Sequence, residues 1–238
     1  MARRIAAGIF ILALPVFLFV GNLIWVVLQV GTYEDAFFNY GAAARTGLSA
    51  DELRTVATAF VDHFRDGTPL ALTVLKNGQT VPMFTEREII HMQDVHNLVQ
   101  FGLRSLAVIA LFYVVFALAG TRWWRGEYAV SLSRNVLRGA GLTIGLLAGI
   151  GLLTLFDFEQ MFILFHVVSF PNDFWILDPA WSYLINLFAQ DFFMNTTMKV
   201  AVTTGAEALL LAIVAGGAIL WRTRYGSAGR ERRHYTGG

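Results

Sequence analysis

Residues 5–30 read IAAGIFILALPVFLFVGNLIWVVLQV, an apolar run of 26 residues that contains no charged side chain. A helix needs about 20 such residues to cross the roughly 30 Å hydrocarbon core of a membrane. Two arginines precede the run, as in a secretory signal peptide, but the apolar part of a signal peptide spans only about 7–15 residues and no A-x-A cleavage site follows. We therefore expect an uncleaved first span, with a cleaved signal peptide as the alternative.

Three further apolar runs follow, at residues 103–120, 139–157 and 200–221. Together with residues 5–30 they predict a mainly α, polytopic membrane protein whose core is a bundle of four transmembrane helices. The composition fits, because 56% of the 238 residues are hydrophobic and 15% are charged, against roughly 25% charged in soluble domains.

The basic residues predict the topology. Segments 1–4, 121–138 and 222–238 hold 11 of the 18 lysines and arginines, and such segments stay in the cytoplasm. We expect both termini inside, with 121–138 as a basic cytoplasmic loop and 222–238 as a basic cytoplasmic tail. Residues 31–98 and 158–198 then lie outside the cell membrane.

The overall charge and the lack of cysteine exclude several classes of protein. The chain has 18 basic and 17 acidic residues, a net charge of +1, so it has no general attraction to phosphate and we expect no nucleic-acid partner. Without cysteine, a disulfide-stapled module, a cysteine-ligated metal site and a cysteine nucleophile are all impossible.

The first outer segment, 31–98, is long enough to fold as a small α+β subdomain. Ser49 and Glu52 form a capping box before an amphipathic helical pattern. Asn77-Gly78 is a strong hairpin signal between two short apolar runs. A second capping box at 85–88 starts a helix that leads into the span at 103–120.

The second outer segment, 158–198, is rich in aromatic residues and interrupted by Pro171 and Pro179. We expect the helix of span 139–157 to continue past the membrane to a turn at 171–173. A short amphipathic helix over 179–193 then lies at the membrane interface.

Gly141, Gly145 and Gly149 share one face of the third span. They predict close helix packing inside the bundle, with homodimerisation as the alternative.

Two histidines are candidates for function, and a third shares the spacing of one of them. His91 and Asp94 lie three residues apart on a predicted helix, so the carboxylate could hold the imidazole in one tautomer. His166 lies in an apolar stretch near the membrane, where a titratable group is a functional candidate. His63 has the same spacing to Asp66 and is expected to be an ordinary surface residue.

Both candidate histidines are expected on the outer side, where they could converge. Two histidines with Asp94 or Asp173 could also ligate zinc, but no H-E-x-x-H or comparable spacing occurs, so we expect no metal.

Two strings are distinctive: residues 91–95 read HMQDV, and residues 165–179 read FHVVSFPNDFWILDP. With four spans and an outer subdomain between the first two, they resemble the bacterial lipoprotein intramolecular transacylase family, called Lit. The sequence departs from the family pattern at Ser182, where an acidic residue is common, and at Ala189, where proline is.

The resemblance implies an acyltransferase of the bacterial cytoplasmic membrane that acts at its extracytoplasmic face on a diacylated lipoprotein. The sn-2 acyl chain of the diacylglyceryl-cysteine moves to the α-amino group of that cysteine and gives the lyso form, without a cofactor. The family's two histidines correspond to His91 and His166. We expect His166 to be the main base, His91 its partner and Asp94 the residue that orients His91. Expected substrate-binding residues are Asn172, Asp173, Trp175 and Asp178.

Two alternatives stay open. One is a non-catalytic four-span lipid-binding or sensor protein, which predicts that His166 is buried far from His91. The other is a different membrane lipid acyltransferase or hydrolase. The H-x4-D pattern of enzymes that use a soluble acyl donor is absent, because Asp94 is three residues from His91 rather than five.

Overall fold

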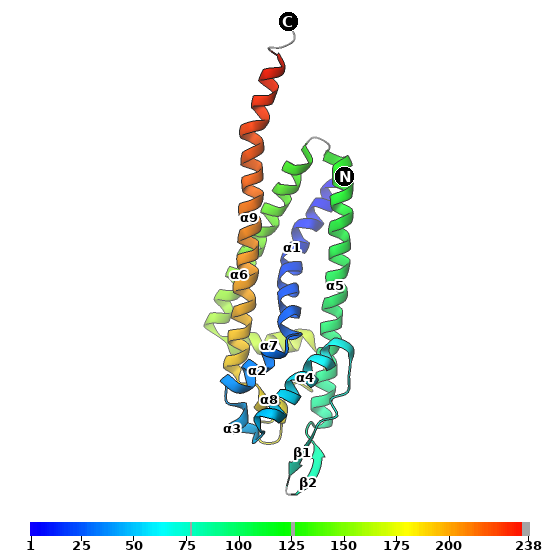
Figure 1. The fold of residues 1–238 in the computed structure, drawn as a ribbon, viewed down its shortest axis with the longest axis vertical. Helices are drawn as coiled ribbons and strands as arrows, with labels where there is room; N and C mark the ends of the chain where they lie inside the picture. Colours follow the sequence, from blue (N-terminus) through cyan, green and yellow to red (C-terminus); the bar gives the residue numbers. More distant parts are fainter. Residues whose placement is uncertain (77, 125–126, 235–238) are drawn as a thin grey trace. The chain divides into compact units, whose positions relative to one another are not determined.

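The computed structural model describes residues 1–76, 78–124 and 127–234, and its secondary structure is almost entirely helical (Figure 1). In chain order the elements are α1 (Ala2–Val27), α2 (Val30–Asn39), α3 (Ala42–Thr46), α4 (Ala50–Asp66), β1 (Thr73–Lys76), β2 (Gln79–Pro82), α5 (Glu86–Trp124), α6 (Tyr128–Phe156), α7 (Phe158–Ser169), α8 (Tyr183–Leu187) and α9 (Gln190–His234).

Four of the described helices are long and apolar enough to cross a membrane. They comprise α1, α5, residues Tyr128–Thr154 of α6 and residues Gln190–Arg224 of α9, and their best windows have mean hydropathies of 2.5, 2.2, 1.8 and 1.8. The expectation of a mainly α, four-span membrane protein is confirmed.

The chain divides into two compact units. Unit 1 contains Met1–Gly21, Leu106–Leu152 and the chain from Ala201 onward, while unit 2 contains Asn22–Ser105 and Leu153–Val200. The two long segments between the spans, which the sequence analysis treated separately, therefore fold together in unit 2. The candidate site lies within this unit.

The core of unit 2 is a cluster of aromatic rings from both segments. Phe60 of α4 is fully buried, and its ring centroid lies 5.7 Å from that of Tyr33 in α2 and 5.8 Å from that of Phe188. Phe37 also contacts Phe188, at 5.4 Å. Each buried ring removes a large apolar area from water, so this cluster fixes the second segment on the first.

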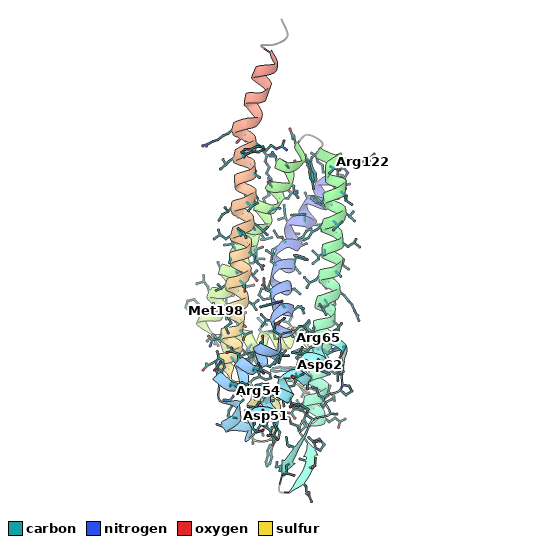
Figure 2. The ribbon with its side chains drawn as sticks, in the orientation of Figure 1. Asp51, Arg54, Asp62, Arg65, Arg122 and Met198 are labelled. Carbon is teal, nitrogen blue, oxygen red and sulfur yellow. The ribbon has the colours of Figure 1, made fainter. Side chains whose placement is uncertain are left out.

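Helix α4 begins at the predicted capping box and is amphipathic, as its sequence predicts. The Ser49 amide donates to Glu52 Oε2 (2.8 Å), and the Glu52 amide donates to Ser49 Oγ (3.3 Å), so the predicted capping box is confirmed. The apolar face is buried. The ion pairs Asp51–Arg54 and Asp62–Arg65, whose residues are labelled in Figure 2, lie on the opposite, exposed face of α4.

The other end of α4 is held by side chains of α5. Gln100 Nε2 donates to the carbonyls of Phe64 (2.9 Å) and Arg65 (3.1 Å), which are among the last carbonyls of the helix and lack partners within it. His63 is buried here, with Nδ1 2.9 Å from the Thr68 carbonyl and Nε2 3.2 Å from the Met92 carbonyl. The prediction that His63 is a surface residue is wrong, because α5 covers it.

The predicted hairpin is present. Strands β1 and β2 pair antiparallel, with Val74 opposite Val81 and Leu75 opposite Thr80. Gly78 has a φ of +77°, in the left-handed region that glycine adopts readily. Asn77, the other residue of the predicted turn, lies outside the described residues.

Two helices of the second outer segment differ from expectation. The helix of the third span does not continue past the membrane: α6 ends at Phe156, and Asp157 caps the separate helix α7 by accepting the Gln160 amide at 3.0 Å. The expected helix over 179–193 is also divided, because Phe188 is extended (φ −112°, ψ 115°) and ends α8. The packing of the Phe188 ring in the aromatic cluster explains this break.

Close helix packing in unit 1 occurs at a glycine other than the three that were predicted. A Cβ atom added at Gly141, Gly145 or Gly149 would meet no heavy atom within 4 Å, so the expected close packing at these positions is wrong. Gly139 is a close approach between α6 and α1, because a Cβ there would lie 2.8 Å from Leu14 Cδ2 of α1.

The segment expected as a basic loop, 121–138, is largely helical. Helix α5 continues to Trp124 and α6 begins at Tyr128, so Arg134 and Arg138 lie within α6. Residues 125–126 lie outside the described residues.

Candidate active site

The structure brings His91 and His166 together. His91 is on the second turn of α5 and His166 is near the end of α7. Each is 8% exposed, and their ring centroids are 5.9 Å apart. Two imidazoles this close can act on one small reacting centre, because general acid–base catalysis needs only hydrogen-bond reach.

His166 is held in one tautomer. Its Nδ1 is 2.8 Å from the carbonyl oxygen of Phe162, one turn earlier in α7. A carbonyl only accepts hydrogen bonds, so Nδ1 carries the proton in the neutral ring, and the lone pair of the imidazole is on Nε2. The neutral side chain is therefore oriented as a base.

Aromatic rings surround His166. The ring centroids of Phe162, Trp175, Phe165 and Phe170 lie 4.2, 4.9, 5.2 and 5.6 Å from its own. Burial among them lowers the pKa of His166 below its usual value, although the bond to the Phe162 carbonyl acts in the opposite direction. The imidazole is thus neutral at physiological pH.

His91 also favours the neutral form. It lies on the polar first turns of α5, before the uncharged stretch that begins at Ser105. Burial, followed by the neighbouring His166, lowers the pKa of His91 from 6.5 to about 4, against the opposing effect of the Asp94 charge. Its Nδ1 is buried without a hydrogen-bond partner among the described residues. Leaving a buried polar atom unpaired is costly, so this nitrogen is open to a polar group of a ligand.

Asp94 does not hydrogen-bond to His91 in the structure. Its Oδ2 instead accepts from Asn172 Nδ2 at 2.8 Å, although its charge still raises the pKa of His91. The structure therefore does not show the expected direct orientation of His91 by Asp94. Asp94 instead links α5 to the loop that follows α7.

That link continues to His166. Asn172 Oδ1 accepts the Phe174 amide at 3.1 Å, and the Asn172 carbonyl accepts from Trp175 Nε1 at 3.0 Å. The Trp175 ring then packs on His166. Asp94, Asn172 and Trp175 thus connect the two histidine-bearing helices through a short chain of contacts.

Asp173 lies on the outer side of the same loop. Its Oδ1 is 3.4 Å from a guanidinium nitrogen of Arg87, and Arg87 Nε donates to the Ile176 carbonyl at 3.1 Å. Arg87 also donates to the Asp173 carbonyl and covers the Phe174 ring. Arg87 was not among the predicted site residues, because only its position on the helix face toward this loop reveals its role.

Asp178 takes part in a local turn. Its Oδ1 accepts the Ala180 amide at 2.9 Å, and its carbonyl accepts the amides of Trp181 and Ser182. Asp178 is exposed, and the structure gives it no contact with either histidine. Of the four predicted substrate-binding residues, Trp175 is the one in ring contact with the pair.

Glu88, predicted only as part of the capping box at 85–88, is fully buried one turn before His91. One carboxylate oxygen accepts from the Thr85 amide (2.6 Å) and hydroxyl (2.8 Å), as the predicted capping box requires. The other accepts from the Ser182 hydroxyl (2.6 Å) and the Leu184 amide (2.8 Å). Glu88 therefore holds the start of α8 against the start of α5.

An apolar surface adjoins His166. Leu164, Phe165, Val167 and Val168 of α7 are 52, 48, 60 and 77% exposed. A contiguous run of exposed apolar side chains on one short helix is typical of a surface that meets lipid. In the described ranges, no group of three or more His, Asp or Glu side chains is arranged to hold a metal ion.

Comparison with known proteins supplies the family. The family model "Lipoprotein intramolecular transacylase Lit" matches residues 8–193. Over 135 residues the chain is 31% identical to an uncharacterized protein of Aquifex aeolicus, a stretch that covers 54% of this chain. It covers 53% of that protein, so the chain spans about half the length of this curated relative.

Solved structures support the fold. The membrane-integral lipoprotein intramolecular transacylase Lit from Bacillus cereus aligns with a TM-score of 0.76 and 16% identity, over 94% of this chain and 98% of that one. Two variants of the same protein, in which one histidine is replaced by arginine or alanine, each align with a TM-score of 0.71. The family model covers most of this chain, and the chain therefore belongs to the lipoprotein intramolecular transacylase family, Lit.

Proposed function

We propose that this transacylase moves the sn-2 acyl chain of a diacylglyceryl-cysteine lipoprotein to the α-amino group of the same cysteine, by acid–base catalysis at His91 and His166. The observation that carries the mechanism is the buried histidine pair, 5.9 Å apart, with Nδ1 of His166 fixed by a carbonyl. It does not fit the alternative of a sensor or lipid-binding protein, which predicts well-separated histidines.

The first step needs a base. An α-amino group has a pKa of about 7.7–8.0, so its ammonium form first releases one proton to solvent, and the neutral amine then reacts. The amine nitrogen attacks the sn-2 ester carbonyl, and Nε2 of His166 takes the proton that the nitrogen sheds. General-base help of this kind contributes about 10²–10⁴-fold to a rate.

The second step returns that proton. The tetrahedral intermediate collapses, its bond to the sn-2 oxygen breaks, and the oxygen takes up one proton to become a hydroxyl. One N–C bond forms and one O–C bond breaks, with a single proton moved from nitrogen to oxygen. The reaction therefore balances without water, a metal or an acyl donor.

His91 is the partner. We assign its unpaired Nδ1 to a hydrogen bond with the oxyanion of the intermediate or with the leaving oxygen. A neutral imidazole suits this role, because it can donate a hydrogen bond without an ion that must be desolvated. Amine and ester belong to one substrate, so positioning contributes as well; intramolecular effective molarities reach about 10⁵–10⁸ M.

The remaining predicted residues serve position and binding. Asp94 and Asn172 are positioning residues that hold Trp175 on His166. Trp175 and the exposed apolar face of α7 bind the acyl chains, while Asp173 and Asp178, both exposed, face the incoming lipoprotein. The arginine-rich segments support a topology with both termini in the cytoplasm and the histidine pair on the extracytoplasmic side of a bacterial cell membrane.

The test is mass spectrometry of a lipoprotein's N-terminal peptide after co-expression with the full chain. We expect the N-acyl, S-monoacylglyceryl form with the native chain and the unchanged diacylglyceryl form with His91→Ala or His166→Ala. His96→Gln, on the same helix as His91, is the matched control and should keep the product. A diacylglyceryl N-terminus with the native chain, across several lipoproteins, would overturn the proposal.

A further inference from the structure

Unit 1 contains an arginine-lined groove outside the histidine site. The first turn of α1, the end of α5 and the first turns of α6 enclose about 340 Å³. Arg3, Arg4, Arg134 and Arg138 line it, together with Glu127 and Asn135.

Among the described residues, acidic side chains do not balance the positive charge of this groove. Four arginines face a single acid, Glu127, which gives the lining a net charge of +3. Among the described residues, none of these arginines forms an ion pair. A guanidinium carries five N–H donors in a planar fork that matches phosphate oxygens in pairs, so the lining is suited to an anion.

Asn135 adds an uncharged donor. It is 5% exposed, and its Nδ2 has no hydrogen-bond partner among the described residues. Buried amides almost always find a partner. An oxygen-rich group in the groove would supply one.

Arg3 is already positioned in the groove. Its guanidinium lies 5.7 Å from the centroid of the Trp124 ring and donates to the Trp123 carbonyl at 3.4 Å. Stacking on an indole restricts a long side chain and leaves its outer N–H groups available. The groove therefore has a charged group held in place before any ligand binds.

The surroundings of the groove indicate that its ligand is a lipid. Its helices are membrane-span candidates, and paired tryptophans at a helix end are typical of the level of lipid headgroups. Below this level α5 exposes apolar side chains, among them Leu118 at 68% and Val115 at 55%. We propose that the groove binds the phosphate of an anionic phospholipid, whose acyl chains lie along the apolar surface of α5. This site is separate from the histidine pair and needs no acyl transfer.

The experiment measures lipid binding to the full-length protein in detergent by native mass spectrometry, with phosphatidylglycerol and phosphatidylcholine as probes. We expect phosphatidylglycerol to bind more tightly. Each arginine near a headgroup contributes about 1 kcal/mol, or about fivefold in affinity, so Arg134→Gln with Arg138→Gln should weaken binding about 30-fold.

Arg122→Gln is the matched control, because Arg122 is exposed on the last turn of α5, where Figure 2 labels it, and does not line the groove. It should bind phosphatidylglycerol as the native protein does. Arg4→Gln, a separate lining position, should show about a fivefold loss, which keeps the test valid if the double variant does not fold.

Three results would overturn the proposal. Equal binding of the two lipids would remove the preference for a net negative headgroup. An effect of Arg122→Gln as large as that of the double variant would remove the assignment to the groove. Displacement of phosphatidylglycerol by equimolar inorganic phosphate would identify free phosphate, rather than a lipid, as the ligand.

Discussion

The hydrogen bond between Asp94 and Asn172 allows a direct test of how the acid near the histidine pair acts. Its length of 2.8 Å is that of a charge-assisted bond. Asp94→Asn removes the charge but keeps an oxygen that can accept from Asn172 Nδ2. Asp94→Ala and Asn172→Ala each remove the bond itself, and with it the link to Trp175 on His166.

The expected losses follow from the type of bond. A hydrogen bond to a charged group contributes about 1.5–3 kcal/mol and a neutral one about 0.5–1.5 kcal/mol. Asp94→Asn should therefore cost about 1–1.5 kcal/mol, or about 5–12-fold in kcat/KM if the whole loss reaches the transition state. The two alanine variants should cost about 10–150-fold each. They break the same bond, so the double variant should lose little more than the worse single one.

The assay follows the initial rate of N-acyl product from a synthetic diacylated lipopeptide, with thermal unfolding of each variant as a folding control. Asp62→Asn, which changes an exposed acid of α4, should leave the rate unchanged. A loss of about 10⁴-fold in Asp94→Asn, with Asn172→Ala near the native rate, would refute this reasoning. It is the loss expected when a carboxylate directly holds a catalytic imidazole.

Three further predictions concern stability. Glu88→Ala leaves the buried Ser182 hydroxyl and Leu184 amide without their acceptor and should cost about 1–3 kcal/mol for each donor left unpaired; a change in unfolding free energy under about 1 kcal/mol would contradict this. Gly139→Ala forces a Cβ to 2.8 Å from Leu14 Cδ2 and should lower the free energy of unfolding by about 1–3 kcal/mol. Gly145→Ala, with open space around it, should leave the free energy of unfolding unchanged. The pKa of His91 is lowered from 6.5 to about 4, so the unfolded chain binds more protons than the folded one between these pH values. The free energy of unfolding should therefore rise with pH in this range, by at most about 1.4 kcal/mol per pH unit. An equal pH dependence of the free energy of unfolding in His91→Gln would oppose this.

Local signals in the sequence predicted local structure well. Both capping boxes form as expected, because each depends on residues three positions apart. The second oxygen of Glu88 shows the limit: it accepts from Ser182 and Leu184, more than 90 residues along the chain. No periodicity or spacing within α5 indicates these partners.

Sequence spacing alone did not distinguish the histidines. His63 and His91 each precede an aspartate by three residues, yet neither hydrogen-bonds to it. His63 is satisfied by carbonyls of Thr68 and Met92, whereas His91 Nδ1 has no partner among the described residues. Packing between helices, rather than helix periodicity, makes this difference.

The breaks in the second outer segment were missed for a related reason. Apolar residues continue through Phe156 and again through Phe188, so the sequence pattern favours unbroken helices. Capping by Asp157 and the insertion of Phe188 among Tyr33, Phe37 and Phe60 override that pattern.

A crossover experiment determines whether the acyl shift at the histidine pair takes place within one substrate molecule. One lipopeptide has an isotopically heavy sn-2 acyl chain on a light peptide, and a second has a light acyl chain on a heavy peptide. The two are mixed and treated with the purified protein. We expect mass spectrometry to find each acyl chain on the amine of its original peptide, and no N-acyl product with His166→Ala. Crossed products, or a native rate in that variant, would contradict it.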